Sequence, residues 1–166
     1  MTDSVTIERI PQIHPKLRTE LYTIYNEICC VLEGIVGCRF TQVFRTFAEQ
    51  DAFYAQGRTT PGDIVTNAKG GQSYHNYGLA VDFVLILDKN GDGRIEEISW
   101  DRLKDYDRDK VADWMEVVNV FTKYGWQWGA SFGDYPHFEK RFNYNWRTLL
   151  ELRNAGKVDS QGYVLI

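Results

Sequence analysis

The sequence predicts an α+β fold, with a small antiparallel sheet packed with several helices in a single domain of residues 1–166. Segments with helical periodicity and short alternating or apolar runs both occur, without the regular βαβ order of a parallel sheet. The composition, 43% hydrophobic and 25% charged, is typical of a chain that buries one core. No repeat or low-complexity segment divides it.

The N-terminal part predicts a helix followed by a strand. Pro15 suits the first turn of a helix, apolar residues then recur at helical spacing, and Gly34 follows the last of them. We therefore expect a helix at 15–33. The alternating run FTQVFRT predicts a strand at 40–46.

A second helix and a long loop come next. Thr46 and Glu49 form a capping box in TFAE, which predicts a short helix through Gln56. Residues 58–72, RTTPGDIVTNAKGGQ, are mostly polar and rich in glycine and proline, which predicts a loop. Loops of this length in a compact domain are usually functional or mobile.

The middle of the chain predicts a β-hairpin. The apolar run GLAVDFVLIL (78–87) indicates a buried strand, and RIEEISW (94–100) indicates its partner. The Asn-Gly and Asp-Gly pairs in DKNGDG (88–93) between them are strong turn signals.

The C-terminal part predicts two further helices. One apolar face runs through residues 107–125, and NWRTLLELRNAG (145–156) ends at a glycine. Residues 126–138 indicate a loop that runs into a short strand. The tail GYVLI (162–166) is expected to add an edge strand.

Charge and composition argue against several classes of function. A net charge of -4 and a pI near 5.4 give no basic surface for nucleic acid. The first 17 residues lack the pattern of a signal peptide, and no apolar run approaches the roughly 20 residues needed to span a bilayer. We therefore expect a protein that is made in the cytoplasm and has no membrane insertion; we also expect a monomer. Cys29, Cys30 and Cys38 favour buried thiols over a disulfide framework.

One stretch, SYHNYGLAVDF, sets an aspartate inside an apolar strand. The buried carboxylate of Asp82 is costly unless a cation meets it, and the cation is either an arginine or a metal. His75 opens this stretch and His137 lies in GDYPHFE, while His14 is expected to be a surface or capping residue. Two histidines and a carboxylate leave one position of a tetrahedral zinc open, as in catalytic sites. Spacing alone leaves an ordinary structural role open for each of these residues.

Three motifs, in order, resemble those of a known family. SYHNYGLAVD resembles the SxHxxGxAxD signature of the M15 zinc peptidases, which include bacterial D-Ala-D-Ala peptidases and phage L-alanyl-D-glutamate endolysins. DYPHFE resembles the acidic-x-x-His element of that family. RFTQVFRTFAEQDAFYAQGRT resembles its strand-arginine-helix segment, so that the resemblance covers about residues 40–140.

This resemblance implies the M15, or Hedgehog-like, peptidase fold and a bound Zn²⁺. It assigns His75, Asp82 and His137 as the zinc ligands. The segment WQWGASFGD (126–134) is shorter than the tryptophan-rich loop of many relatives, which bears on the shape of the substrate cleft.

The resemblance also implies the catalytic and substrate-binding residues. Asp134 takes the place of the catalytic acid, with Glu139 as the alternative, and Arg45 that of the arginine that polarises the scissile carbonyl. Ser73 is expected to make hydrogen bonds to substrate or to the metal ligands. Without the resemblance, Arg45 would be read as a surface ion pair, and Asp134 as a turn residue before Pro136.

A possible second ion site lies in the hairpin turn, which matches the first half of an EF-hand loop. The twelfth position is Ser99 instead of glutamate, so Glu96 or Glu97 would have to substitute. A polar turn without an ion explains the same residues. The expected Ca²⁺ ligands are Asp88, Asn90, Asp92 and the backbone carbonyl of Arg94.

Taken together, these features predict a zinc-dependent peptidoglycan hydrolase. The expected substrate is the bacterial stem peptide, cut at the L-alanyl-D-glutamate bond in the manner of an endolysin. One alternative is a D-Ala-D-Ala carboxypeptidase or dipeptidase. Another is a non-catalytic, metal-stabilised module that binds the cell wall. The expected place of action is the cell wall, reached through a holin if the protein derives from a phage.

Overall fold

β2 (Ala80–Leu87) is the central strand of a five-stranded antiparallel sheet. In the computed structural model, which describes residues 1–166, β1 (Val36–Gln42) pairs along one edge of β2. On the other edge, β5 (His137–Glu139) pairs with the first half of β2 and β3 (Glu97–Ser99) with the second half. β4 (Gln127–Trp128) adds outside β5. The predicted α+β class is confirmed.

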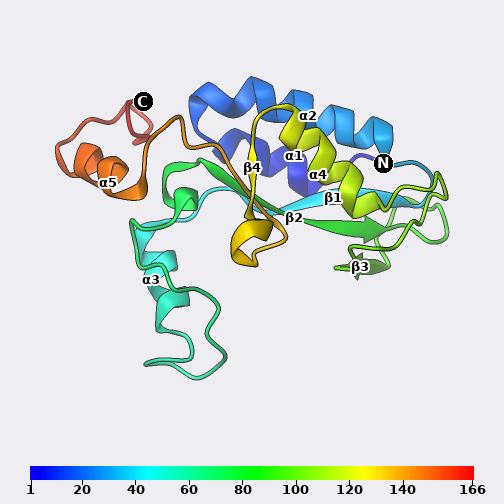
Figure 1. The fold of residues 1–166 in the computed structure, drawn as a ribbon, viewed down its shortest axis with the longest axis horizontal. Coiled ribbons are helices and arrows are strands. Elements are labelled where there is room, and N and C mark those ends of the chain that lie inside the picture. Colours follow the sequence, from blue (N-terminus) through cyan, green and yellow to red (C-terminus); the bar gives the residue numbers. More distant parts are fainter.

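Three α-helices lie against one face of this sheet (Figure 1). They are α1 (Ser4–Arg9), α2 (Arg18–Val31) and α4 (Asp113–Lys123). Two short 3-10 helices, η1 (Ile10–Gln12) and η2 (Pro15–Leu17), connect α1 to α2. None of the helices combines the length and the hydrophobicity required to cross a bilayer.

Aromatic contacts join α4 to β2 and β5. Trp114 packs on Phe83 of β2 with ring centroids 4.3 Å apart. Phe121 stacks on Phe138 of β5 at 4.4 Å and an interplanar angle of 9°. Such contacts add to the hydrophobic free energy of burial and have a defined geometry. The position of α4 therefore constrains β2 and β5 together.

The remaining helices lie at the margin of the sheet. Figure 1 shows α3 (Phe47–Ala55) and the segment after it projecting from the body, with α5 (Trp146–Asn154) at the C-terminal side. The capping box predicted for α3 is present in both directions. The 3-10 helices η3 (Tyr74–Tyr77) and η4 (Gly129–Phe132) precede β2 and β5.

Several predicted boundaries are wrong. The strand expected at 40–46 runs instead over residues 36–42, because pairing with β2 starts at Val36↔Leu87 and is interrupted by a bulge before Gln42. The tail 162–166 forms only an isolated bridge, Val158↔Val164, and no strand.

The helix expected from residue 107 begins six residues later, at Asp113. The side chains of Asp105, Asp107 and Asp109 accept hydrogen bonds from backbone N–H groups up to five residues further along the chain. Aspartates that bond to nearby backbone in this way compete with helix formation. The segment before α4 is therefore an ordered loop.

Two smaller expectations need correction. Of the three cysteines only Cys38 is buried, whereas Cys29 is partly exposed and Cys30 is exposed. The short helix α1 was not predicted; Asp3 caps it by accepting the backbone N–H of Thr6.

Candidate metal centre

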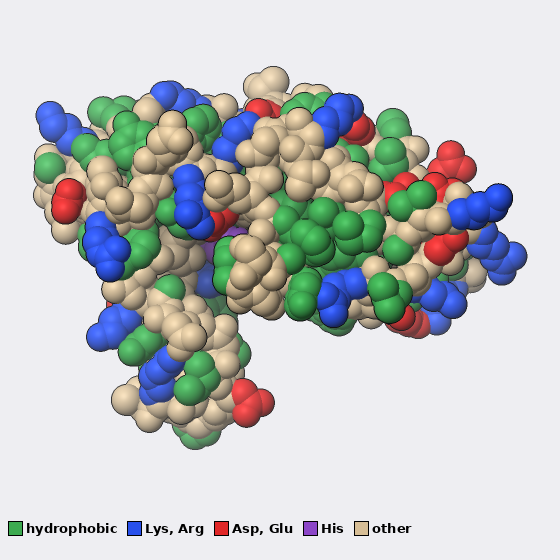
Figure 2. Space-filling view, viewed as in Figure 1, with side chains coloured by type: hydrophobic (Ala, Val, Ile, Leu, Met, Phe, Trp, Pro, Cys, Tyr) green, Lys and Arg blue, Asp and Glu red, His purple; other side chains and the backbone are tan.

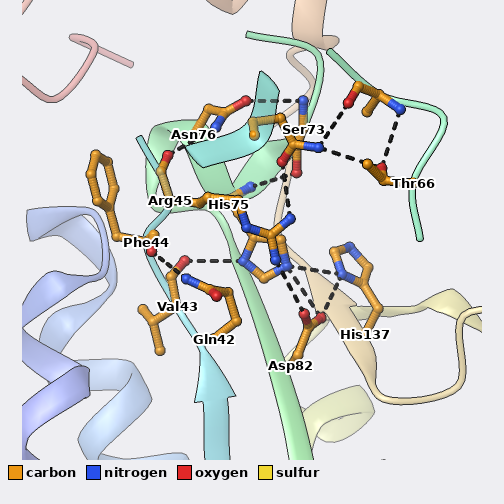
Figure 3. A network of polar contacts seen from close by, with 12 residues as sticks. Gln42, Val43, Phe44, Arg45, Thr66, Ser73, His75, Asn76, Asp82 and His137 are labelled. Carbon is orange, nitrogen blue, oxygen red and sulfur yellow. Dashed lines mark hydrogen bonds and ion pairs between the residues drawn. The ribbon is translucent and has the colours of Figure 1, made fainter. Parts of the chain in front are cut away.

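Three side chains from separate elements meet at one point beside the central strand. His75 Nε2 lies 3.2 Å from Asp82 Oδ1 and 3.2 Å from His137 Nδ1. The distance from His137 Nδ1 to Asp82 Oδ1 is 2.9 Å. Figure 3 shows the three side chains pointing toward one another. The structure therefore brings together the three residues that the resemblance assigned as ligands.

The hydrogen bonds of the two imidazoles indicate which ring nitrogens face this point. His75 Nδ1 lies 3.2 Å from the carbonyl oxygen of Val43, which can only accept, so Nδ1 carries the hydrogen and donates. His137 Nε2 in the same way donates to Glu139 Oε2 at 3.1 Å. The lone pairs of His75 Nε2 and His137 Nδ1 and the Asp82 carboxylate then converge within 3.2 Å.

Lone pairs in such proximity repel one another unless a proton or a metal ion lies among them. Ligand atoms 2.0–2.2 Å from a tetrahedral ion are about 3.3–3.6 Å apart, close to the separations seen between these three atoms. Two neutral imidazoles and one carboxylate suit zinc and related transition metals. The residues present therefore form a group able to hold one metal ion, with a coordination position left for water or substrate.

Local sequence explains how His75 is placed. Ser73 caps η3 by accepting the N–H of His75, and Asn76 Oδ1 accepts the N–H of Ser73 in return. Gly78 ends η3 at φ +64°, and an added Cβ would lie 2.7 Å from the backbone nitrogen of His14. The chain can therefore turn directly from His75 into β2 only with glycine at this position.

The sheet positions the other two members of the group. Asp82 of β2 and His137 of β5 are direct cross-strand partners, so their side chains stand on the same face. Gly129 lies behind this pair: a Cβ there would meet the backbone oxygen of Asp134 at 2.4 Å. The short segment between β4 and β5 can therefore pack closely against the site.

The electrostatic field at this point is strongly negative. Burial of His137 would lower its pKa, but the carboxylates of Asp82 and Glu139 raise the pKa to about 9. Burial of Asp82 opposes its ionisation, yet His75 and His137 hold the pKa of this carboxyl well below its usual value. Such a field favours bound cations.

Arg45 lies at the edge of the group, as Figure 3 shows. Its Nη2 is 4.0 Å from Asp82 Oδ2, and its Nη1 donates to Gln50 Oε1 at 3.0 Å. Burial lowers the pKa of the Arg45 guanidinium, partly offset by Asp82. Gln50 is fully buried and also donates to the carbonyl of Ala68. Its side chain therefore connects Arg45 to the loop of residues 58–72.

A cleft of about 680 Å³ opens beside the metal-binding group. Figure 2 shows the hollow between the projecting part and the body, with histidine atoms visible at its inner corner. Asp134, His137 and Ser73 line it together with Thr66 and Trp146. Partial desolvation beside the cleft and the nearby Asp82 carboxylate raise the pKa of Asp134, whose exposed carboxylate has no hydrogen bond within the protein.

The predicted calcium loop is folded as a hairpin turn. Asp88, Asp92 and Glu96 offer oxygens within 4.8 Å of one another, so of the two glutamates expected to substitute it is Glu96 that joins the loop. Glu97 instead pairs with Lys89. Calcium binding here remains a prediction.

Three positioning residues were missed by sequence reasoning: Glu139 as the partner of His137, Asn76 in the cap of η3, and Gln50 beneath Arg45. For Glu139 the spacing of two from His137 on a strand was an available signal, because alternate residues share a face. His14, expected at the surface or as a cap, does cap η2 but is buried, with Nε2 2.9 Å from the carbonyl of Val164.

This group supplies the two imidazoles and one carboxylate that a catalytic metal site requires. Residues 66–140 match a peptidase M15 family model described as D-alanyl-D-alanine carboxypeptidase. The peptidoglycan L-alanyl-D-glutamate endopeptidase CwlK of Bacillus subtilis (strain 168) is 49% identical over 102 residues. That alignment covers 60% of this chain and 58% of CwlK, so the chain spans somewhat more than half the length of this relative. The matches confirm the resemblance to the M15 family over the segment that carries the metal-binding group.

Proposed function

We propose that this protein is a zinc-dependent peptidase that hydrolyses the L-alanyl-D-glutamate bond of the peptidoglycan stem peptide. The observation that carries the proposal is the 49% identity to a relative named for that activity. The metal-binding group and the adjoining cleft supply the chemistry such an activity requires.

His75, Asp82 and His137 would hold the Zn²⁺ ion, since their free lone pairs already face one point. A zinc ion with three protein ligands lowers the pKa of a bound water to about 7 and polarises a carbonyl oxygen. Glu139 and the carbonyl of Val43 hold the two imidazoles in the tautomers that metal binding needs.

Asp134 would move the proton. Its carboxylate faces the cleft without a protein partner, and its raised pKa suits a group that takes a proton and returns it to the leaving amine. Arg45 would stabilise the developing oxyanion, because its guanidinium is held beside the group by Gln50. Ser73 lines the cleft and would contact substrate while also capping η3.

A second candidate keeps the same residues and moves the scissile bond to D-Ala-D-Ala. The description of the matching family as D-alanyl-D-alanine carboxypeptidase favours it. The two candidates differ in which bond of the stem peptide would lie against the metal-binding group.

Digestion of purified peptidoglycan by the zinc-loaded protein separates these functions. Mass spectrometry of the products should show stem peptides with a new glutamate amino terminus, together with L-alanine left on the glycan. Release of D-alanine alone would establish the carboxypeptidase reading. If the zinc-loaded protein produces neither a new amino terminus nor a free amino acid, both peptidase functions are contradicted and a cell-wall-binding module is favoured.

We also propose that the protein acts at the cell wall as a monomer. The place of action follows from the proposed substrate, and the proposal extends to holin-dependent release if the gene derives from a phage. Gel filtration coupled to light scattering should give a mass near 19.3 kDa.

A further inference from the structure

An acidic segment before α4 gathers five carboxylates. Oxygens of the first group, Asp105, Asp107 and Asp113, lie within 4.8 Å of one another. So do oxygens of the second group, Asp107, Asp109 and Glu116, and Asp107 belongs to both. No lysine, arginine or histidine forms an ion pair with any of the five. Their negative charge is therefore not balanced by the protein.

Two of these carboxylates are buried and incompletely bonded. Asp113 is fully buried; its Oδ2 accepts the N–H of Tyr106 at 2.8 Å, but its Oδ1 has no hydrogen-bond partner. Glu116 is 8% exposed, and its Oε2 also has no partner. Burial, reinforced by Asp107 and Asp109, raises the pKa of Glu116 to about 8. Buried carboxylate oxygens without a partner are costly, so these two point to a cation as their counter-charge.

The spacing of the five residues specifies which kind of cation. In DYDRDKVADWME the carboxylates occupy positions one, three, five, nine and twelve of a twelve-residue loop. An EF-hand loop binds Ca²⁺ with oxygen ligands at these positions and with a backbone carbonyl at position seven, here Val111. Position twelve is Glu116, the residue type that supplies two oxygens in EF-hands. This loop therefore has the glutamate at position twelve that the hairpin turn lacks.

The backbone of the segment has the shape that this ligand arrangement needs. Position six of an EF-hand is normally glycine because the chain turns sharply there. Lys110 occupies that position at φ +84°, and Arg108, two residues earlier, has φ +68°. Gly91 and Gly93, at the same positions of the hairpin turn, have φ +75° and +86°. The acidic segment thus adopts the same turn with residues that disfavour it.

We propose that residues 105–116 bind one calcium ion through the carboxylates of Asp105, Asp107, Asp109, Asp113 and Glu116. All the ligands are oxygens, which suits a hard cation. Calcium accepts their number and irregular arrangement better than magnesium, which requires a near-octahedral shell. The hairpin turn is a weaker candidate, because its position twelve is Ser99 instead of a glutamate.

The ion would fasten α4 to the rest of the fold. Asp113 and Glu116 lie in the first turn of α4, and Asp107 accepts the N–H of Glu33 just beyond α2 at 3.1 Å. Trp114 of the same turn packs on Phe83, one residue from Asp82. Calcium would therefore stabilise the domain and brace the strand that carries a member of the metal-binding group.

The test uses the full-length, zinc-loaded chain with calcium chloride as the probe. We expect a dissociation constant on the order of 10⁻⁵ M, and a rise in Tm of about 5–10 °C at a calcium concentration 100-fold higher. Magnesium chloride should give a smaller rise. Terbium, which substitutes for calcium, should luminesce on excitation of Tyr106 and Trp114, and calcium should quench this signal by displacement.

Glu116→Gln and Asp107→Asn should each remove most of the calcium-dependent rise in Tm and the terbium signal. In the presence of a chelator, Glu116→Gln should melt at or above the temperature of the wild type, because one repelling charge is gone; this shows that the variant folds. The matched control Asp92→Asn, in the hairpin turn, should keep the rise. The proposal is overturned if calcium leaves the wild-type Tm unchanged, or if Glu116→Gln and Asp107→Asn both keep the full rise.

Discussion

Glu139 Oε2 accepts a hydrogen bond from His137 Nε2 at 3.1 Å, two residues away on the same strand and face. Its other oxygen, Oε1, accepts from Arg141 Nε at 2.5 Å. Both oxygens are therefore occupied, which favours a role for Glu139 in orienting the imidazole over proton exchange with substrate. Of the two acids that the sequence left as candidates for proton transfer, this pair favours Asp134.

Glu139→Gln should weaken zinc binding about 10–100-fold, because partners of this kind fix the tautomer and raise the basicity of a metal ligand. Competition with a chromogenic chelator measures the affinity. Glu151→Gln, an exposed glutamate of α5, is the matched control and should bind zinc like the wild type. Unchanged affinity with a large loss of turnover would instead make Glu139 the proton-transfer residue.

Asp134→Asn should keep its zinc and lose about 10²–10⁴-fold in turnover, the usual cost of removing a general acid or base. The amide has nearly the shape of the carboxylate but cannot accept a proton. Zinc content and the rate of peptidoglycan hydrolysis should be measured on the same preparation. Turnover close to that of the wild type would assign the proton transfer to another residue.

The Asp3–Arg39 pair should make stability depend on acidity. Burial of Asp3 raises its pKa, but hydrogen bonds from Arg39 and Thr6 outweigh burial and lower the pKa below 3.8. A carboxyl whose pKa is lower in the folded state contributes stability above its unfolded pKa and loses it as the pH falls through the folded value. Asp3→Asn should therefore cost about 1–3 kcal/mol at pH 7, and progressively less as the pH falls below 3.8.

Urea unfolding of the wild type and Asp3→Asn at pH 7, 5 and 3 checks this. Asp63→Asn, an exposed loop residue, is the control and should show little effect at any pH. An Asp3→Asn deficit that stays the same from pH 7 to pH 3 would rule out the ionic contribution.

The hairpin turn should bind calcium only weakly, with a dissociation constant on the order of 10⁻⁵–10⁻³ M, because it lacks a glutamate at position twelve. The measurement is made in a Glu116→Gln background, so that the acidic segment does not contribute. Millimolar calcium should still raise Tm slightly, and adding Asp88→Ala with Asp92→Ala should abolish that rise. If calcium does not raise the Tm of the Glu116→Gln variant, residues 88–93 form a hairpin turn that binds no calcium.

The α+β class and most elements could be predicted because their signals are local. Thr46 and Glu49 specify the cap of α3, and the turn pairs in 88–93 specify the hairpin. The error at β1 has a physical cause: which residues of an alternating run join a sheet depends on the partner strand. The late start of α4 has another, since Asp105 and its neighbours bond to backbone and thereby oppose helix formation.

The metal-binding residues could be predicted only because three motifs occurred together. Their spacing along the chain does not reveal that His137 faces Asp82, which depends on the pairing of β5 with β2. Gln50 and the acidic segment were missed for different reasons. Gln50 acts through tertiary contacts alone, whereas the carboxylate spacing of 105–116 was visible in the sequence but overlapped a helical apolar pattern.

The most direct test of the account is the zinc content of the purified protein and of two variants. The wild type should contain close to one zinc ion per chain by atomic emission after exhaustive buffer exchange. His75→Ala and His137→Ala should each lose most of it, since either change removes one of three converging ligands. Full zinc retention in both variants would contradict the assignment of His75, Asp82 and His137 as the metal centre.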